Sequence, residues 1–355
     1  MIMASRFYMP AEWEEHQRML MAWPVSGFSS GEGLREAREA YADTARAIAE
    51  FEPVVMLANS DHSGQAREMC GGGVSVLEIE HDDAWIRDNG PTFVLDGGGS
   101  LVGVSWNFNA WGLKYPDYAL DDTVPEKLCQ VWGVPVVKPG IVLEGGSVHT
   151  NGRGTVIATE ECLLNGNRNP RLGRKEIESV LMEYLGAERV VWLPFGLCDD
   201  ETDGHVDNVC CFIAENTVLI PWTDDRTSGN YARFERNRRE LEARGLSAET
   251  VVHPAPTRFD GRELALSYVN FVFANGAVIM PAFGGGHEST DALARDRMRE
   301  LFPEREIVQL PALPIVKAGG GIHCITQQVP GETPARPRPS DPERYTRDSS
   351  KERCF

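Results

Sequence analysis

Apolar residues recur at helical spacing in most of five long stretches of the chain. In one of them Ile177, Val180, Leu181 and Leu185 fall on a single face of a helix with 3.6 residues per turn. The five predicted helices are Leu34–Phe51, Thr123–Val131, Arg174–Leu185, Asn230–Arg244 and Asp291–Leu301. Most are followed by a short apolar run that predicts a strand, namely Val54–Leu57, Val134–Val137, Arg189–Trp192 and Glu306–Leu310. The pattern predicts a mixed α/β protein with helices outside a layer of strands.

A second pattern places a polar, chemically capable residue just before or at a strand signal. The five positions are Asp88, Glu144, Asp207, Asn270 and Cys324, and they are separated by 56, 63, 63 and 54 residues. Four of them precede a pair of short apolar runs joined by a Gly/Asn turn, namely Thr92–Leu95 and Leu101–Val104, Val148–Thr150 and Thr155–Ala158, Val209–Ile213 and Thr217–Pro221, and Phe271–Phe273 and Ala277–Met280. Repetition of one such unit predicts a ring or a solenoid. In a closed ring, equivalent strand ends would converge on one pocket.

Composition supports a single large domain. The chain has 355 residues, of which 42% are hydrophobic, and dividing the repeat would leave apolar strand faces without partners. We therefore expect one domain over residues 1–330, built of five units of about 60 residues. Residues 331–355 contain four prolines, many charges and almost no apolar side chains, so we expect a disordered or loosely attached tail.

Charge narrows the choice of partners. There are 35 basic and 53 acidic residues, and the net charge of −18 disfavours nucleic acid, whose phosphates need clustered Lys and Arg. The same charge favours entry of a small cation, although plain solubility is the simpler explanation of it. No apolar run is long enough to span a membrane, and Met1–Arg6 leads into no signal peptide, so a cytoplasmic protein without membrane attachment is expected.

The eight cysteines lack the CxxC spacing of zinc sites. Cys210 and Cys211 are adjacent on a predicted strand, so their side chains should face opposite ways, and reduced, mostly buried thiols are expected. Cys324 differs, because it follows Gly319, Gly320 and Gly321. Glycines let the backbone approach a ligand closely and present N–H groups, which suits a nucleophilic thiol. An inert core cysteine is the alternative.

Two further groups suggest acid–base chemistry and cation binding. His205 and Asp207, two residues apart on a predicted strand, would point to one face, and an imidazole beside a carboxylate suits proton transfer. A zinc site is a less favoured interpretation of these two residues, and a polar pair in a loop without a catalytic role is the ordinary alternative. Asp88 and Glu144 could be ordinary turn residues. If they share a pocket with Asp207, however, the carboxylates repel unless a cation such as a planar guanidinium lies among them.

Trp85 lies two predicted strand steps before Arg87. Its ring would stack on such a planar group or on an alkyl chain, with core packing as the alternative.

With these residues assembled, the chain resembles the agmatine deiminase family of the guanidino-group-modifying, or pentein, superfamily, which includes bacterial-type peptidylarginine deiminases. The resemblance extends from Met9 to about Pro330. It is carried by five stretches, Trp85–Pro91, Glu144–Ser147, Glu161–Pro170, Asp200–Asn208 and Ile322–Gln328. It implies a pentein fold, a five-bladed pseudo-symmetric α/β propeller with a central active site.

The resemblance also implies roles for individual residues. Cys324 would be the nucleophile and His205 the acid/base, with Glu144 orienting His205. Asp88 and Asp207 would grip the guanidinium, and we place Trp85, Gly320 and Gly321 with the substrate-binding groups. The chain departs from the family pattern at Asn89, where Thr is usual, and in the run Ala318–Gly321, where three glycines and an asparagine are usual.

The implied reaction is hydrolysis of a C–N bond in a linear amidine, converting agmatine to N-carbamoylputrescine and ammonia through a covalent S-amidino-cysteine, a step of polyamine (putrescine) biosynthesis or arginine degradation. No metal and no organic cofactor are expected, and a homo-oligomer is plausible. Alternatives are a deiminase of arginine, methylated arginine or peptidyl arginine, a non-catalytic guanidine- or polyamine-binding protein, and a generic thiol amidase. Asp82, Asp83 and Glu12 are weak candidates for contact with the distal end of the substrate.

Overall fold

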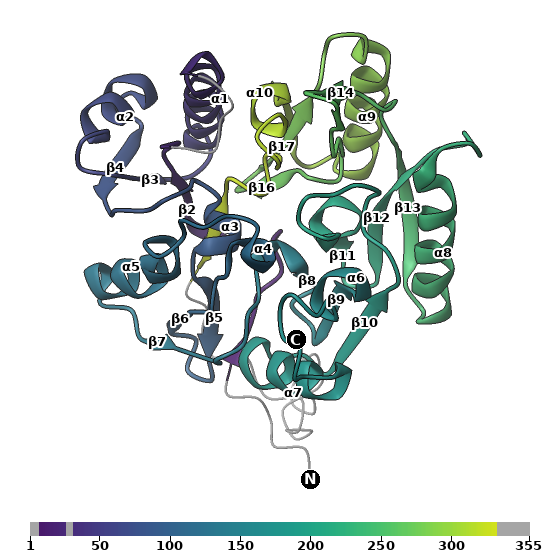
Figure 1. Cartoon of the computed structure of the whole chain (residues 1–355), viewed down its shortest axis with the longest axis horizontal. Helices are drawn as coiled ribbons and strands as arrows, with labels where there is room; N and C mark the ends of the chain where they lie inside the picture. The colour runs from purple at the N-terminus through teal and green to yellow at the C-terminus, as the bar shows by residue number, and fades with distance from the viewer. Residues whose placement is uncertain (1–6, 26–30, 332–355) are drawn as a thin grey trace, which may run out of the picture.

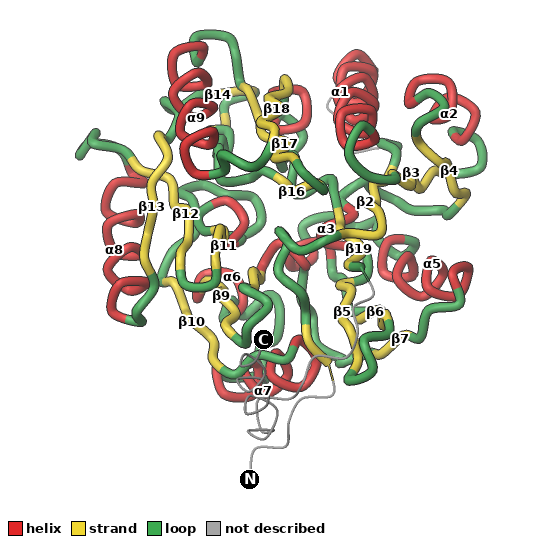
Figure 2. Tube along the Cα trace, turned by 180° about the vertical axis from the view of Figure 1, so that it is seen from behind, coloured by secondary structure: helices red, strands yellow, loops and turns green. Residues whose placement is uncertain are grey.

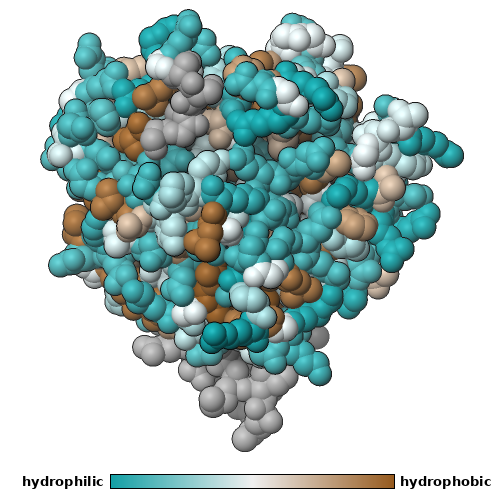
Figure 3. Space-filling view, viewed as in Figure 1, coloured by the Kyte–Doolittle hydropathy of each residue, from teal (hydrophilic) through white to brown (hydrophobic). Residues whose placement is uncertain are grey.

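The computed structural model describes residues 7–25 and 31–331. It is a mixed α/β fold, which confirms the predicted class. The predicted tail lies almost wholly outside the described residues. None of the helices within the described ranges is both long and apolar enough to cross a membrane. Figure 3 shows a mostly hydrophilic face with scattered apolar residues.

One arrangement of strands and helix recurs along the described chain. A first strand pairs antiparallel with a second, and a helix then leads to a third strand that pairs parallel with the second. Two sheets of this kind come first. They are β5 (Thr92–Asp96), β6 (Leu101–Val104), α5 (Val124–Trp132) and β7 (Val136–Val137), then β8 (Val148–Thr150), β9 (Thr155–Thr159), α7 (Arg174–Leu185) and β10 (Arg189–Leu193).

Two more sheets repeat the arrangement with longer parallel ladders. They are β11 (Cys211–Ala214), β12 (Thr217–Trp222), α8 (Gly229–Ala243) and β13 (Ser247–Val252), then β16 (Val272–Ala274), β17 (Ala277–Ala282), α9 (Glu288–Leu301) and β18 (Glu306–Pro311). The parallel ladder of β12 and β13 runs without a register shift from Thr217↔Ser247 to Trp222↔Val252. Such long crossovers are what parallel strands require.

A fifth sheet joins the two ends of the described chain. The C-terminal β19 (Gln327–Pro330) pairs antiparallel with β2 (His16–Ala22), and α1 (Gly31–Ala49) leads from β2 to the parallel β3 (Val54–Ala58). This sheet continues through α2 (Ser63–Cys70) to β4 (Val74–Glu78). Figure 2 shows β19 beside β2. Because β19 begins three residues after Cys324, this pairing anchors the C-terminal end of the site.

The smaller elements lie between these units. They are β1 (Phe7–Tyr8), which adds to β5, the hairpin β14 (Arg258–Phe259) and β15 (Arg262–Glu263), and the short turns α3 (Ile86–Asn89), α4 (Ala110–Leu113), η1 (Asp121–Thr123), η2 (Gly145–Ser147), α6 (Glu160–Leu163), η3 (Val206–Asn208) and α10 (Leu313–Val316). In Figure 1 the long helices lie around the outside, and α3 and α4 lie near the middle.

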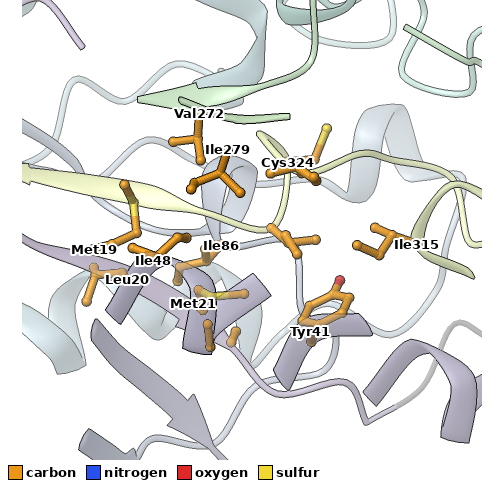
Figure 4. Close-up of a cluster of buried hydrophobic side chains, with 14 of the residues drawn as sticks. Met19, Leu20, Met21, Tyr41, Ile48, Ile86, Val272, Ile279, Ile315 and Cys324 are labelled. Carbon is orange, nitrogen blue, oxygen red and sulfur yellow. The ribbon is translucent and has the colours of Figure 1, made fainter. Parts of the chain in front are cut away.

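The buried side chains form a core that supports the central turns. All five residues of β3 are buried, as expected for a parallel strand covered on both faces. Figure 4 shows Cys324 beside a cluster that includes Met21 and Ile86, with its sulfur directed away from these aliphatic side chains. Cys210 and Cys211 belong to different clusters, which agrees with the prediction that they face opposite ways.

Helix ends match local sequence signals. Gly133 and Gly186 follow α5 and α7 in the left-handed conformation, with φ of 65° and 71°, which glycine adopts without a Cβ clash. A Cβ at Gly186 would also lie 2.4 Å from the carbonyl oxygen of Phe7. Position 186 therefore requires glycine for two reasons, the positive φ and the close approach of β1.

Several predicted boundaries need correction. Arg174–Leu185 matches α7, but the strand predicted from Val134 contains only Val136–Val137. The strand predicted from Val209 begins at Cys211, because the turn η3 precedes it. The helix α2 and the strand β4 were not predicted. Both are short, and α2 buries only Ser63, Ala66 and Cys70, so its apolar periodicity is weak.

Candidate active site

The five repeated polar positions lie in or beside short turns that precede the first strand of each unit. Asp88 is in α3, Glu144 precedes η2 and Asp207 is in η3, whereas Asn270 and Cys324 precede β16 and β19. All five side chains are buried. The structure brings these residues together, although 236 residues separate the first from the last.

The Cys324 thiol lies among polar groups at the edge of the core. Its Sγ is 3.5 Å from Asp207 Oδ2 and accepts a hydrogen bond of 3.3 Å from Asn270 Nδ2. Burial raises the pKa of Cys324 well above its usual value, and the negative charges of Asp207 and Asp88 raise it further. The N–H of Gly321 and the amide of Asn270 act in the opposite direction. Without an added cation, this thiol stays protonated near neutral pH.

His205 precedes the turn η3, so the prediction that His205 and Asp207 lie two residues apart on a strand was wrong. They still reach one place, because a Cβ at Gly146 would lie 2.7 Å from His205 Nδ1 and 3.0 Å from Asp207 Oδ2. His205 Nε2 is 3.8 Å from Glu144 Oε2, and Nδ1 is 3.8 Å from Asp88 Oδ1. Burial lowers the pKa of His205, but Asp88, Cys162 and Glu144 together raise it well above the usual value.

Glu144 is held from behind by Arg168. Arg168 Nε donates to Glu144 Oε1 at 2.8 Å, and the same guanidinium pairs with Asp203 at 2.6 Å. Burial raises the pKa of Glu144, but His205 and Arg168 bring it below its usual value. Glu144 is therefore ionised, and its other oxygen faces the imidazole of His205. Sequence reasoning gave Arg168 no role, although it lies in the conspicuous run Glu161–Pro170.

Asp88 is fixed by neutral donors on both oxygens. Trp111 Nε1 donates to Oδ2 at 2.9 Å, and the Gly146 N–H donates to Oδ1 at 3.1 Å. Burial raises the pKa of Asp88, and His205 opposes this effect. Trp111 was not predicted as a site residue. It lies in the turn α4, where Ala110, Trp111 and Leu113 have φ of 51°, 55° and 63°, values uncommon for residues other than glycine.

Asp207 has one engaged oxygen and one open oxygen. His323 Nδ1 lies 2.9 Å from Oδ2, whereas Oδ1 is buried and has no hydrogen-bond partner among the described residues. Burial raises the pKa of Asp207, but its hydrogen bond with His323 and the charges of His323 and His205 bring it below the usual value. Glu144 Oε2 and both nitrogens of His205 likewise lack partners within the described part of the chain. Buried polar atoms of this kind are normally satisfied by water or a ligand.

Trp85 and the loop of Gly320 and Gly321 pack together beside Cys324. Trp85 precedes α3 and is not on the predicted strand. A Cβ at Gly320 would lie 2.4 Å from the Trp85 ring, and one at Gly321 would lie 2.3 Å from Asn270 Oδ1. Both glycines therefore let the loop pack against Trp85 and Asn270 without a clash.

Comparison with known proteins agrees with this geometry. The sequence model of the Porphyromonas-type peptidyl-arginine deiminase family matches residues 8–330. The chain belongs to this family. The agmatine deiminase of Stutzerimonas stutzeri is 44% identical, with 91% of this chain and 95% of that protein covered. That of Pseudomonas aeruginosa is also 44% identical, with 92% and 96% covered. The predicted family resemblance is confirmed.

Solved structures give the same result. An agmatine deiminase of Enterococcus faecalis, described as catalysing its reaction, superposes with a TM-score of 0.87 at 34% identity, covering 92% of this chain and 97% of that one. A cysteine-to-serine variant of the agmatine deiminase of C. jejuni, with substrate bound, gives 0.86 at 27% identity, covering 93% and 97%. The match therefore extends over nearly the whole of each chain.

Charged side chains also lie beside the glycine loop that precedes Cys324, and we call Asp83, Lys114, Glu201, Asp203 and Arg262 the mouth of the site. Glu201 accepts hydrogen bonds from Tyr115 Oη and from Arg262 Nη1, the latter at 2.9 Å. A Cβ at Gly319 would lie 2.9 Å from Glu201 Oε2, so the carboxylate contacts the glycine loop before Cys324. Burial raises the pKa of Asp83 to about 7, and nearby acids, including Glu201, add to the rise.

The three weak candidates for the distal end of the substrate lie in different places. Asp83 Oδ2 accepts from Trp85 Nε1 at 3.1 Å, which places Asp83 beside the predicted substrate-stacking ring. Asp82 Oδ2 accepts from the Leu120 N–H at 2.8 Å. Glu12 instead lies behind His323, 3.0 Å from its Nε2. Asn89, a departure from the family pattern, donates to the Asp83 carbonyl at 3.0 Å and so joins α3 to the Asp83 segment.

Within residues 7–25 and 31–331, two groups of buried side chains have ligand atoms close enough for a metal ion, namely Glu12, His149 and His323, and Glu144, Cys162 and His205. Each carboxylate already has a cationic neighbour, Arg87 at 3.4 Å from Glu12 and Arg168 at 2.8 Å from Glu144. Such neighbours weigh against a second cation at the same oxygen. The expectation of no metal stays a prediction.

Proposed function

We propose that this protein is an agmatine deiminase, which hydrolyses the guanidinium of agmatine to N-carbamoylputrescine and ammonia. The observation that carries the proposal is a buried thiol, Cys324, 3.5 Å from a carboxylate whose second oxygen is open. Curated agmatine deiminases that are 41–45% identical over more than 90% of the chain support the choice of substrate.

The charges in the site favour a planar cation. Asp88, Glu144 and Asp207 are all buried beside Arg168, His205 and His323, yet Asp207 Oδ1 and Glu144 Oε2 have no hydrogen-bond partner among the described residues. A guanidinium has five N–H donors in one plane, so it satisfies the open Oδ1 of Asp207 and a lone pair of Asp88 together. Its charge also lowers the pKa of the Cys324 thiol, which the same two carboxylates raise in the unliganded site.

The proposed mechanism has two stages. The bound guanidinium lowers the pKa of the Cys324 thiol, the thiol loses its proton to solvent, and the thiolate sulfur attacks the guanidinium carbon held by Asp88 and Asp207. Protonated His205 transfers its proton to the leaving nitrogen, the C–N bond breaks, and ammonia departs from an S-amidino-cysteine. Neutral His205 then takes a proton from water, whose oxygen attacks the same carbon. The C–S bond breaks, the remaining hydroxyl proton passes to the departing sulfur, and the Cys324 thiol is restored as the ureido product is released. This sequence needs no cofactor.

The mouth supports agmatine over arginine. Agmatine ends in an ammonium, whose charge would favour ionisation of Asp83, whereas the α-carboxylate of arginine would disfavour it. Arg262 is a basic side chain at this mouth, but it is already engaged with Glu201 and with the Lys317 carbonyl. We therefore rank arginine and peptidyl arginine below agmatine.

We extend the proposal to the architecture. The five sheets would form five blades around the site, and residues 1–330 would form one catalytic domain. The recurrence of one antiparallel and one parallel pairing in each sheet supports this view, as does the pairing of β19 with β2. A cytoplasmic location, a homo-oligomer and the absence of nucleic-acid partners stay predictions.

The test is an ammonia-release assay with agmatine, arginine and a peptidyl-arginine substrate. We expect kcat/KM for agmatine to exceed that for arginine by at least about 100-fold, the size of discrimination expected when a site pairs with one charged group and opposes another. Cys324→Ala should bind agmatine without releasing ammonia. Cys70→Ala, which removes a buried thiol from the peripheral helix α2, is the matched control. Preference for arginine, or turnover by Cys324→Ala, would overturn the proposal.

A further inference from the structure

His323 lies between two buried carboxylates. Its Nδ1 is 2.9 Å from Asp207 Oδ2, and its Nε2 is 3.0 and 3.1 Å from the two oxygens of Glu12. All three side chains are buried. An ionised carboxylate only accepts hydrogen bonds, so contact with one at each nitrogen requires a hydrogen on both. The geometry therefore favours an imidazolium at His323.

Arg87 anchors Glu12, at the other end of this row of contacting side chains. Its Nη1 is 3.4 Å from Glu12 Oε1 and donates to Gln328 Oε1 at 2.7 Å, while its Nε donates to the His323 carbonyl at 3.3 Å. Positive and negative groups thus alternate from Arg87 through Glu12 and His323 to Asp207. His323 and Arg87 hold the pKa of Glu12 well below its usual value despite burial, so this alternation persists at neutral pH.

The contact with His323 decides which oxygen of Asp207 stays open. Oδ2 faces His323 and the Cys324 sulfur, whereas Oδ1 has no partner among the described residues. Rotation about the last bond of an aspartate side chain is soft, because that torsion has only broad minima. A donor at Oδ2 therefore fixes the rotation of the carboxylate and, with it, the position of the open Oδ1.

The other carboxylate of the site has a different support. Asp88 is fixed by the main-chain N–H of Gly146 and by the indole of Trp111, both neutral and both placed by turns. Asp207 instead depends on a charged side chain, and that side chain depends on Glu12. Removal of the His323 contact would free Asp207 to rotate while leaving Asp88 in place.

We propose that His323, held by Glu12, is a positioning residue that fixes the Asp207 carboxylate so that its Oδ1 receives the guanidinium of the substrate. This inference rests on the proposed function and adds two residues to it. His323 acts through Asp207 and makes no contact of its own with the reacting atoms. Glu12, 311 residues away in sequence, keeps the imidazole in place.

Two substitutions at His323 test the roles of its two ring nitrogens separately. In His323→Asn the amide nitrogen falls near the position of Nδ1 and still donates to Asp207, whereas in His323→Gln it reaches toward Glu12 instead. We expect His323→Gln to lower kcat/KM for agmatine about 100-fold and His323→Asn about 10-fold or less, the range found for outer-shell partners of a reacting group. In a Cys324→Ala background, calorimetry should show weaker agmatine binding for His323→Gln than for His323→Asn.

The outcomes distinguish this inference from the proposed function. If the wild-type enzyme releases no ammonia from any guanidine, the proposed function fails. If the wild-type enzyme is active but the two variants are equally active or equally impaired, or if His323→Asn is the worse, His323 only fills space and the inference is overturned.

Should either histidine variant fail to melt cooperatively, Glu12→Gln provides the second test, because it keeps the volume and removes the charge that holds His323. We expect this variant to lower kcat/KM about 10-fold, chiefly through KM, while melting as a folded protein. Unchanged kinetics in Glu12→Gln would contradict the inference.

Discussion

The buried interior of the site and its mouth are built in different ways. In the interior, Arg168 fixes Glu144, Trp111 and Gly146 fix Asp88, and His323 fixes Asp207. At the mouth, partly exposed ion pairs connect segments that are distant in sequence, Lys114 with Asp203 at 2.8 Å and Arg262 with Glu201 at 2.9 Å. Exposed pairs of this kind contribute only about 0–1 kcal/mol, whereas an unpaired buried charge is far more costly.

We therefore expect the buried interior to control the chemical step and the mouth to control the affinity for the substrate. Substitutions in the interior should abolish or greatly reduce turnover, because each group there is buried and is held by specific hydrogen bonds. Substitutions at the mouth should shift substrate affinity by small factors and leave the chemical step unchanged. Four predictions test this contrast, in order of decreasing effect.

Loss of the interior imidazole should have the largest effect. His205→Asn removes the group that would protonate the leaving nitrogen and activate water, so kcat should fall about 10³-fold with little change in KM. The measurement is steady-state ammonia release from agmatine. His62→Asn, at the start of the peripheral helix α2, is the control and should retain wild-type kinetics. A kcat within a few-fold of wild type for His205→Asn would remove His205 from the mechanism.

Removal of one interior charge should weaken binding. In a Cys324→Ala background, Asp88→Asn should raise the agmatine Kd about 30-fold or more, because truncation of a buried charge pair costs at least about 2 kcal/mol. Titration calorimetry measures the change. Asp43→Asn, which removes an exposed acid from α1, should leave Kd unchanged. Equal affinities for the two variants would show that Asp88 does not hold the guanidinium.

The protonation of Cys324 can be followed by alkylation. Burial and the two aspartates raise the pKa of the Cys324 thiol, and only the thiolate reacts, so alkylation by iodoacetamide should be slow at pH 7. Its rate should still be rising above pH 9, beyond the usual thiol pKa of about 8.5. Peptide mass spectrometry reports the rate, with the protein unfolded in urea as the reference. A plateau below pH 8 would mean that the thiolate forms without substrate.

The mouth should give the smallest effect. Glu201→Gln should raise KM for agmatine about three- to five-fold and leave kcat within about two-fold, because a partly exposed charge is screened by water. Glu300→Gln, which breaks an exposed pair on α9, is the matched control and should change neither constant. A large fall in kcat for Glu201→Gln would contradict the expectation that the mouth does not affect the chemical step.

Sequence patterns predicted the mixed α/β class and the helix Arg174–Leu185, because apolar periodicity reports burial directly. The spacing of Asp88, Glu144, Asp207, Asn270 and Cys324 also indicated that these residues share one place. The strand predicted through His205 was wrong, since a short 3₁₀ turn has no periodic signal.

The contacts that hold the site residues in place could not be predicted from the sequence. Trp111 reaches Asp88 only because α4 adopts positive φ at consecutive residues, which no apolar pattern encodes. Glu12 meets His323 only because β2 pairs with β19 across the whole length of the described chain. Contacts between distant segments are set by tertiary packing, and local patterns carry little information about them.

The covalent intermediate provides the most direct test of the central claim. The enzyme is mixed with excess agmatine, quenched in acid during turnover and digested, and the peptide containing Cys324 is weighed by mass spectrometry. The account predicts an increase equal to agmatine minus ammonia on Cys324, absent from the Cys324→Ala protein. An unmodified Cys324 during full-rate turnover, or an adduct on another residue, would contradict it.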